Sequence, residues 1–198
     1  MPIVRHRFRD LAGGCAVATA LAGTGFAQTT TVIDAGRFER TSASVAVEAG
    51  SFYVGSTAIP FNLIVPDFRP LVAGMLRDST TFRRQCQRLE NEPTLIVRLR
   101  RALHPLPPHS RAQTRIVRAP SGTLAADIEV PALDDHVELI AHEIEHVVEQ
   151  LDNIDLAAAA ARPGTGVRLL STAPLIFETT RAMRVGRLVA EEVRRAAR

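Results

Sequence analysis

The stretch HVELIAHEIEHVVEQL, residues 136–151, decides the fold. Its apolar residues recur every three or four positions, which is the period of one helix face; they are Val137, Ile140, Ile144, Val147 and Leu151. Asp134 or Asp135 stands before the stretch as a candidate N-cap, and Asp152-Asn153 follows it. The pattern therefore predicts an amphipathic helix over residues 136–151.

Two histidines on this helix carry the chemistry. His142 and His146 are four residues apart, so both rings project from one face and can bind a single metal ion. A catalytic zinc takes three protein ligands and leaves one position open. Glu143 follows the first histidine, where it can accept a proton from metal-activated water and pass it to a leaving amine. The alternative is a solvated polar stripe that includes Glu149, and the narrowness of the polar face argues against it.

The segment His142-Glu143-Ile144-Glu145-His146 resembles the HExxH helix of the zincin metallopeptidases. The motif match covers about ten residues. The order of elements predicted from Asp67 to Val193 is also similar to a minimal zincin domain. The resemblance implies a bound Zn2+, hydrolysis of peptide bonds, and a peptide or protein substrate that lies along the sheet edge.

The third ligand distinguishes the zincin groups. The metzincin pattern places a glycine and then a ligand after the second histidine, where this chain has Glu149 and Asp152, so a metzincin is disfavoured. Gluzincins take a glutamate from a separate downstream helix, and Glu178 fits that position on the predicted final helix. The usual asparagine before that glutamate is replaced by Phe177. Asp152 and Asp155 stay open as alternative ligands.

Each of these carboxylates also has a structural explanation. Glu178 suits the first turn of a helix, whose N-terminus favours negative charge. Asp152 and Asp155 suit helix termination, or could hold a histidine ring through its other N–H group. No residue is assigned to stabilise an oxyanion, although the sequence offers four aromatic candidates: Tyr53, His104, His109 and His136.

The segments around the motif helix alternate between strand and helix patterns. Strands are predicted at 94–99 and, as a hairpin, at 116–118 and 123–130, with weaker extended segments at 44–54 and 59–65. A helical stretch runs from Asp67 or Pro70 to about Leu89, with breaks expected at Gly74 and at residues 79–81, and a last helix runs from Pro174 through Val193. This order predicts an α+β fold in which a small antiparallel sheet packs on helices.

The first residues have the pattern of a bacterial Sec-type signal peptide. A basic start precedes the charge-free run 11–26, and Ala27 ends a plausible cleavage site. The run is too short for a stable membrane span, and lipidation at Cys15 is disfavoured because Asp10 is badly placed. We therefore expect a signal peptide at 1–27, an N-terminal extended segment at 28–66, a zincin-like catalytic domain at 67–198, and a periplasmic or secreted protein.

Charge and cysteine content narrow the function further. The leader carries three Arg and one Asp, so its removal lowers the formal charge from +3 to +1 and removes the reason to invoke nucleic acid. Cys86 is then the only cysteine, and its helical setting predicts a buried structural thiol. The sequence leaves the oligomeric state open.

Two functions are compatible with these features. The first is an exported zinc-dependent peptidase in which His142, His146 and Glu178 bind zinc and Glu143 is the general base. The second is a non-catalytic zincin-like module of the cell envelope that binds metal or another protein. The short chain, Phe177 and the lack of an assigned oxyanion residue favour the second.

Overall fold

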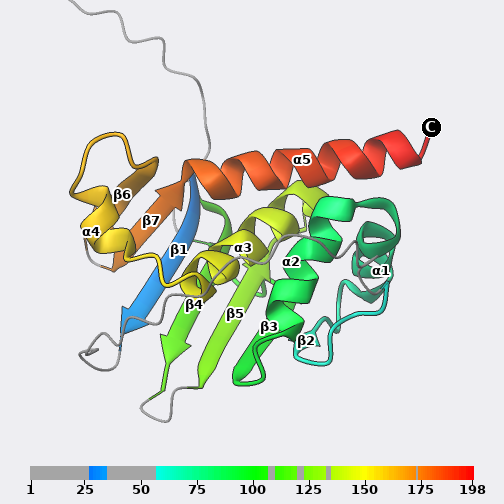
Figure 1. Cartoon of the computed structure of the whole chain (residues 1–198), viewed down its shortest axis with the longest axis horizontal. Coiled ribbons are helices and arrows are strands. Elements are labelled where there is room, and N and C mark those ends of the chain that lie inside the picture. The colour runs from blue at the N-terminus through cyan, green and yellow to red at the C-terminus, as the bar shows by residue number, and fades with distance from the viewer. Residues whose placement is uncertain (1–26, 35–56, 107–109, 120–122, 133–134, 173) are drawn as a thin grey trace, which may run out of the picture.

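The computed structural model describes residues 27–34, 57–106, 110–119, 123–132, 135–172 and 174–198. These residues form one seven-stranded sheet with the order β2-β3-β5-β4-β1-β7-β6 and five helices (Figure 1). The strands are β1 (Ala27–Asp34), β2 (Leu63–Ile64), β3 (Leu95–Arg101), β4 (Ser110–Arg118), β5 (Leu124–Val130), β6 (Val167–Thr172) and β7 (Leu175–Thr179). The helices are α1 (Arg69–Asp78), α2 (Thr80–Glu90), α3 (His136–Leu151), α4 (Leu156–Ala160) and α5 (Thr180–Ala196).

The sheet is mixed. β2, β3 and β5 are parallel neighbours, β4 runs antiparallel to β5, and β1 runs parallel to β4 and antiparallel to β7. The α+β class predicted from the sequence is confirmed, while the sheet is larger than the small antiparallel sheet expected. The difference arises because β1 and β2, from the segment before residue 67, and β6 and β7, from the segment after residue 166, join the same sheet. The α1–α2 connection between β2 and β3 also allows these two strands to be parallel.

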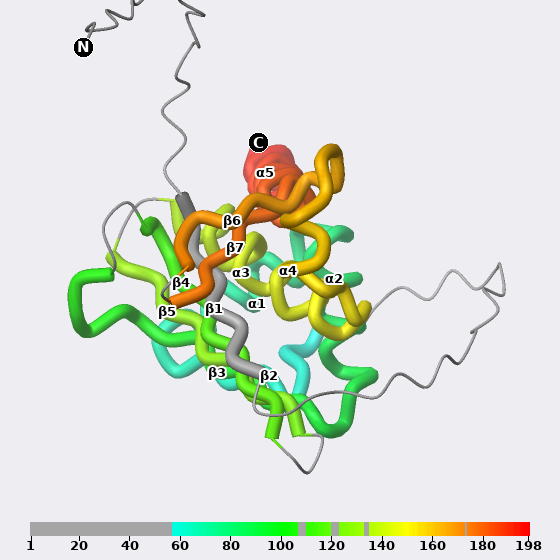
Figure 2. Tube along the Cα trace, turned by 90° about the vertical axis from the view of Figure 1, so that its left-hand side faces the viewer, coloured from blue at the N-terminus to red at the C-terminus, as the bar shows by residue number. Residues whose placement is uncertain are grey.

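One face of the sheet forms the core. Along β3 the side chains of Leu95, Val97 and Leu99 are buried, whereas Arg98 and Arg100 lie on the other face. Those arginines form ion pairs with acidic residues of β5, namely Asp127 and Glu129. Figure 1 shows α2 and α3 in front of the sheet, and the side view of Figure 2 places α2 and α4 on the same side of the strands. The motif helix therefore packs its apolar stripe onto the buried sheet face.

The predicted helical stretch before residue 90 is broken into two helices. Ser79 ends α1 and caps α2, because its side chain accepts a hydrogen bond from the backbone N–H of Phe82 at 2.9 Å. This confirms the break expected at residues 79–81. None of the helices in the described part of the chain is long and apolar enough to cross a membrane.

The carboxyl group of Glu192 on α5 fixes this break. One of its oxygens accepts a hydrogen bond from the backbone N–H of Thr81 at 3.0 Å and another from the hydroxyl of Ser79, and its other oxygen accepts from the Thr81 hydroxyl at 2.8 Å. Partial burial opposes ionisation, but these hydrogen bonds outweigh it and lower the pKa of Glu192. The ionised carboxylate therefore ties α5 to the start of α2.

Replacing Glu192 with alanine is expected to lower the free energy of unfolding by about 1–2 kcal/mol at pH 7. A carboxyl group whose folded pKa is lowered stabilises the protein above its unfolded pKa, so the difference should shrink as acid protonates it. Urea unfolding at pH 7 and pH 4 measures both effects. Glu191→Ala is the control, because Glu191 is exposed and pairs with Arg195 on its own helix. Equal losses in the two variants would contradict the capping role.

The region after residue 173 differs from the prediction. Instead of one helix from Pro174 to Val193, the chain forms strand β7 and then α5, which begins at Thr180. Leu175 to Phe177 pair with β6, and Ile176 and Phe177 also pair with β1. Hydrogen bonding to distant strands therefore overrides the helical pattern of this segment. Glu178 therefore lies on a strand and not on the final helix.

The other predicted segments agree with the structure in part. The motif helix spans the predicted residues, and the hairpin of β4 and β5 is present with a longer first strand than expected. The first part of the N-terminal extended segment predicted at 28–66 forms most of β1, which lies inside the sheet. Residues 1–26 of the signal peptide predicted at 1–27 and the extended segment 44–54 lie outside the described residues, while Ala27 is the first residue of β1.

Candidate metal centre

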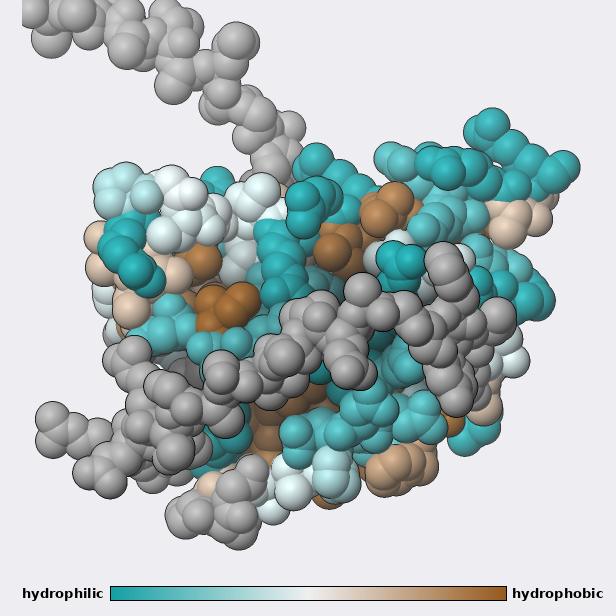
Figure 3. Space-filling model, in the orientation of Figure 1, coloured by the Kyte–Doolittle hydropathy of each residue, from teal (hydrophilic) through white to brown (hydrophobic). Residues whose placement is uncertain are grey.

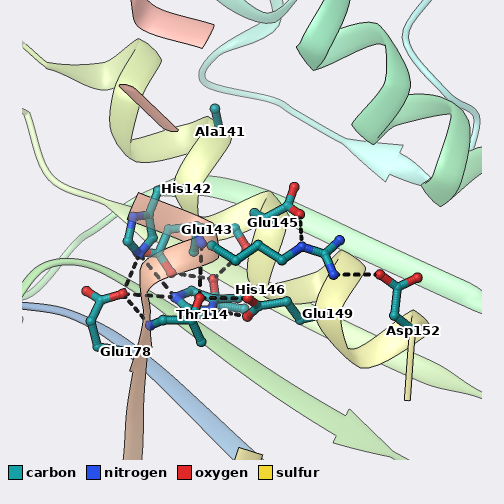
Figure 4. A network of polar contacts seen from close by, with 12 residues as sticks. Thr114, Ala141, His142, Glu143, Glu145, His146, Glu149, Asp152 and Glu178 are labelled. Atoms are coloured by element: carbon teal, nitrogen blue, oxygen red, sulfur yellow. Dashed lines mark hydrogen bonds and ion pairs between the residues drawn. The ribbon is translucent and has the colours of Figure 1, made fainter. Parts of the chain in front are cut away.

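Helix α3 presents two imidazole nitrogens to one point (Figure 4). His142 and His146 lie one turn apart on α3, which is buried on all sides from Leu139 to Glu149, and their side chains are 3% and 0% exposed. Their Nε2 atoms are 3.0 Å apart. The helical spacing in the sequence therefore results in two converging donor atoms.

Glu178 brings a carboxylate to the same point from the end of β7. Its Oε1 atom lies 3.3 Å from Nε2 of His142 and 3.9 Å from Nε2 of His146. The same oxygen accepts a hydrogen bond of 2.7 Å from the backbone N–H of Thr179. This bond fixes the carboxylate against the start of α5.

These three residues could hold a metal ion, since one donor atom from each lies within 4.8 Å of the others. A tetrahedral zinc ion with bonds of ~2.0–2.1 Å keeps its ligand atoms about 3.3 Å apart. The donor separations of 3.0, 3.3 and 3.9 Å are close to that value. Two imidazoles and one carboxylate are also a donor set that zinc accepts.

The two aspartates named as alternative ligands have other roles. Asp152 at the end of α3 pairs with Arg88 and with Arg181. Asp155 caps α4, because its Oδ1 accepts a hydrogen bond of 2.8 Å from the backbone N–H of Ala158. The structure thus brings Glu178, and neither aspartate, to the histidines.

Burial and neighbouring charges shift the pKa values of the cluster residues in opposite directions. Burial lowers the pKa of His142 and outweighs the effect of its contact with Glu178. Burial also opposes protonation of His146, but the hydrogen bond with Glu149 and the neighbouring carboxylates raise its pKa. Burial opposes ionisation of Glu178, yet the two histidines lower its pKa. The carboxylate is thus held in its ionised, metal-binding form.

Glu143 is a buried carboxyl group beside this cluster. Its side chain is fully buried, and burial raises its pKa to about 7. Its Oε2 atom accepts a hydrogen bond of 2.6 Å from the hydroxyl of Thr114 on β4. Its Oε1 atom has no hydrogen-bond partner among the described residues. A carboxyl with a pKa near neutrality and one unused oxygen is suited to accept and return a proton.

Glu149 was not identified as part of the site from the sequence, where it was named only as a member of the disfavoured solvated stripe and at the metzincin glycine position. It is buried, and its Oε2 lies 2.9 Å from Nδ1 of His146. Its Oε1 accepts a hydrogen bond of 2.6 Å from the hydroxyl of Thr179, which also caps α5 by accepting from the backbone N–H of Ala182. With Nδ1 donating to Glu149, Nε2 of His146 faces the metal position. The signal was available, because residues three apart on a helix are neighbours.

Replacing Thr179 with valine is expected to lower zinc affinity by about 10–100-fold, since Glu149 loses the donor that orients it. Competition with a chromogenic chelator measures the affinity. Thr179→Ser keeps the hydroxyl and should keep the affinity. Asp155→Ala removes the cap of α4, so it should cost stability but no zinc affinity. Unchanged affinity in Thr179→Val would contradict this positioning role.

A second polar cluster near the site joins three helices. Glu145 of α3 accepts hydrogen bonds from Gln85 of α2 at 2.7 Å and from Arg181 of α5 at 2.6 Å. Arg181 also donates to Asp152 at 2.8 Å. Because its carboxylate is satisfied by these partners, Glu145 stabilises the packing around the site.

The other candidates from the sequence lie apart from the cluster or outside the description. His136 contacts the carbonyl of Pro131 at 3.0 Å and the ring of Phe68, and His104 is exposed. Tyr53 and His109 lie outside the described residues. Cys86 is buried, and burial raises its pKa to about 12, which confirms a structural thiol.

Comparisons with models of known families, with curated proteins and with solved structures gave no match to this chain. The class that the fold and the site define is an α+β protein with a buried His-His-Glu group able to hold a metal ion. Any more specific function therefore has to be argued from the chemistry of these side chains.

Proposed function

We propose that this chain is an exported zinc-dependent peptidase of the zincin type, similar to the gluzincins in taking its third ligand from a downstream glutamate, although Glu178 lies on strand β7 and not on a helix. One observation carries the proposal: His142, His146 and Glu178 converge within 4.8 Å beside the buried carboxyl group of Glu143. Metal ligands alone would suit storage or structure. The buried carboxyl of Glu143, whose Oε1 has no hydrogen-bond partner among the described residues, adds the proton acceptor that hydrolysis requires.

Each side chain has a role in this mechanism. The two histidines and Glu178 would hold zinc, which supplies Lewis-acid activation of water and of a peptide carbonyl when bound. Glu143 accepts the proton of the attacking water through its unpaired Oε1 and returns it to the leaving amine. Thr114 keeps the carboxyl oriented through its hydrogen bond to the other oxygen.

Metal content and hydrolysis of the purified mature protein test the proposal. We expect about one zinc per chain, lost in His142→Ala and in Glu178→Ala, because a site with only two protein ligands binds zinc weakly. A fluorogenic peptide library should be hydrolysed, and 1,10-phenanthroline should stop the hydrolysis until zinc is restored. A protein without stoichiometric zinc would refute the proposal.

The second candidate is a non-catalytic metal-binding or interaction module of the cell envelope. The burial of the cluster favours it, since the three donor residues are at most 2% exposed. A protein that holds one zinc per chain and cleaves nothing in the library would support this function instead.

A further inference from the structure

Strand β1 lies beside the candidate metal centre. It lies between β4, which provides Thr114, and β7, which provides Glu178. Thr30 of β1 is opposite Thr114 on one side and opposite Phe177, the neighbour of Glu178, on the other. Helix α3 also contacts β1. The backbone of this strand therefore lies between the strand that carries Thr114 and the strand that carries Glu178.

The site is closed to a polypeptide in this arrangement. His142 and Glu178 are each 2% exposed, and His146 and Glu143 are fully buried. A scissile carbonyl must reach hydrogen-bonding distance of the catalytic groups. At least one element that covers the cluster must therefore move before a peptide can be hydrolysed.

Strand β1 is attached in the way that a separate peptide would be. Its sequence, AQTTTVID, has little apolar content, and residues 35–62 separate it from β2. It pairs through its backbone with two strands at once, over seven registered positions on β4 and two on β7. Recognition of a strand by backbone hydrogen bonds tolerates many sequences.

The ligands keep other supports when β1 is absent. β7 remains paired with β6, and α5, which follows Glu178 directly, packs against α3. The hydroxyl of Thr179 is bonded to Glu149 on α3, independently of β1. Departure of β1 would therefore open the space between β4 and β7 while the metal ligands stay in place.

We propose that the slot between β4 and β7 binds an extended polypeptide through its backbone, and that β1 is the intramolecular occupant of this slot. The inference rests on the proposed peptidase function, because it names the form of its substrate. A substrate strand replaces β1 beside Thr114 and Glu178. The affinity for substrate is then reduced by the fraction of molecules in which β1 is in place.

The double variant Thr30→Pro with Val32→Pro tests this inference. Proline lacks the backbone N–H group and is not tolerated inside a sheet, so β1 should leave the slot while the chain keeps its length. The probe is a peptide hydroxamate, an extended peptide that ends in a zinc-chelating group. We expect the proline variant to keep one zinc per chain and to bind the probe at least about tenfold more tightly than the wild type.

Controls separate the possible outcomes. Thr30→Ala with Val32→Ala keeps the backbone pairing and should bind the probe like the wild type. In the wild type, probe binding should increase amide hydrogen exchange in β1 while β5 stays protected. If the proline variant loses zinc, fails to fold or gains no affinity, β1 is a fixed part of the fold and the inference is wrong. A wild type without zinc would instead refute the proposed function.

Discussion

Replacing Glu143 with glutamine is expected to reduce peptide hydrolysis by about 10²–10⁴-fold, while zinc content stays unchanged. The amide has the shape of the carboxyl group but cannot accept a proton at catalytic pH. The Thr114 hydroxyl, 2.6 Å from Oε2 in the wild type, can still donate to the amide oxygen. Because the substitution removes an ionisable group that is fully buried, the fold should lose no stability.

Two comparisons make this result specific. Glu138→Gln changes a half-buried glutamate in the first turn of the same helix, and it should leave kcat/KM unaffected. Zinc analysis of Glu143→Gln separates loss of chemistry from loss of metal. Full activity in Glu143→Gln would show that this carboxyl is not the general base, even if the metal centre is real.

Replacing Gly186 with alanine is expected to have the largest effect on stability. Gly186 lies on α5 where this helix crosses α3, and an added Cβ would lie 2.8 Å from the carbonyl oxygen of Glu138 and 3.1 Å from Cβ of His142. The first contact is with backbone, so the two helices must separate. Overpacking of this kind costs about 1–3 kcal/mol. Zinc affinity should fall as well, because the shift moves His142.

Gly74 provides the matched control. It also lies inside a helix, α1, but the nearest atom to an added Cβ is the flexible guanidinium of Arg77 at 3.8 Å. Gly74→Ala is therefore expected to stabilise the protein by about 0.5–1 kcal/mol through helix propensity. Thermal and urea unfolding should give opposite signs for the two variants. Equal stability of Gly186→Ala and wild type would show that the helices are not in close contact there.

The elements that the sequence predicted well are those with a local signal. The period of residues 136–151 and the alternation in β3 depend only on neighbours in the chain. β1 and β7 were missed because their structure depends on pairing with each other and with β4 and β6. The polar sequence of β1 lacks the alternation of a strand. The sequence of β7 runs directly into that of α5, so its residues were predicted as part of that helix.

The residues of the candidate site were also predictable only where the signal is local in the sequence. His142 and His146 follow from helical spacing, and Glu178 was chosen from its place after a loop although its element is a strand. Thr114 lies on β4, a strand that precedes the motif helix, and no local pattern links it to Glu143. Partners of this kind become visible only when distant segments are packed together.

The surface facing the viewer in Figure 3 has only small hydrophobic areas separated by hydrophilic residues. Backbone pairing, which needs no apolar surface, is consistent with that character.

The long distance in sequence between paired strands has a consequence for the order of folding. β1 is synthesised before every other described element, yet one of its partners, β7, comes near the end of the chain. Pairing of such distant segments is slow because a long loop must close first. Hairpin β4–β5 and helix α3 are close in sequence and can form earlier. The histidine pair is thus expected to meet metal ions during folding, before β1 has docked between β4 and β7.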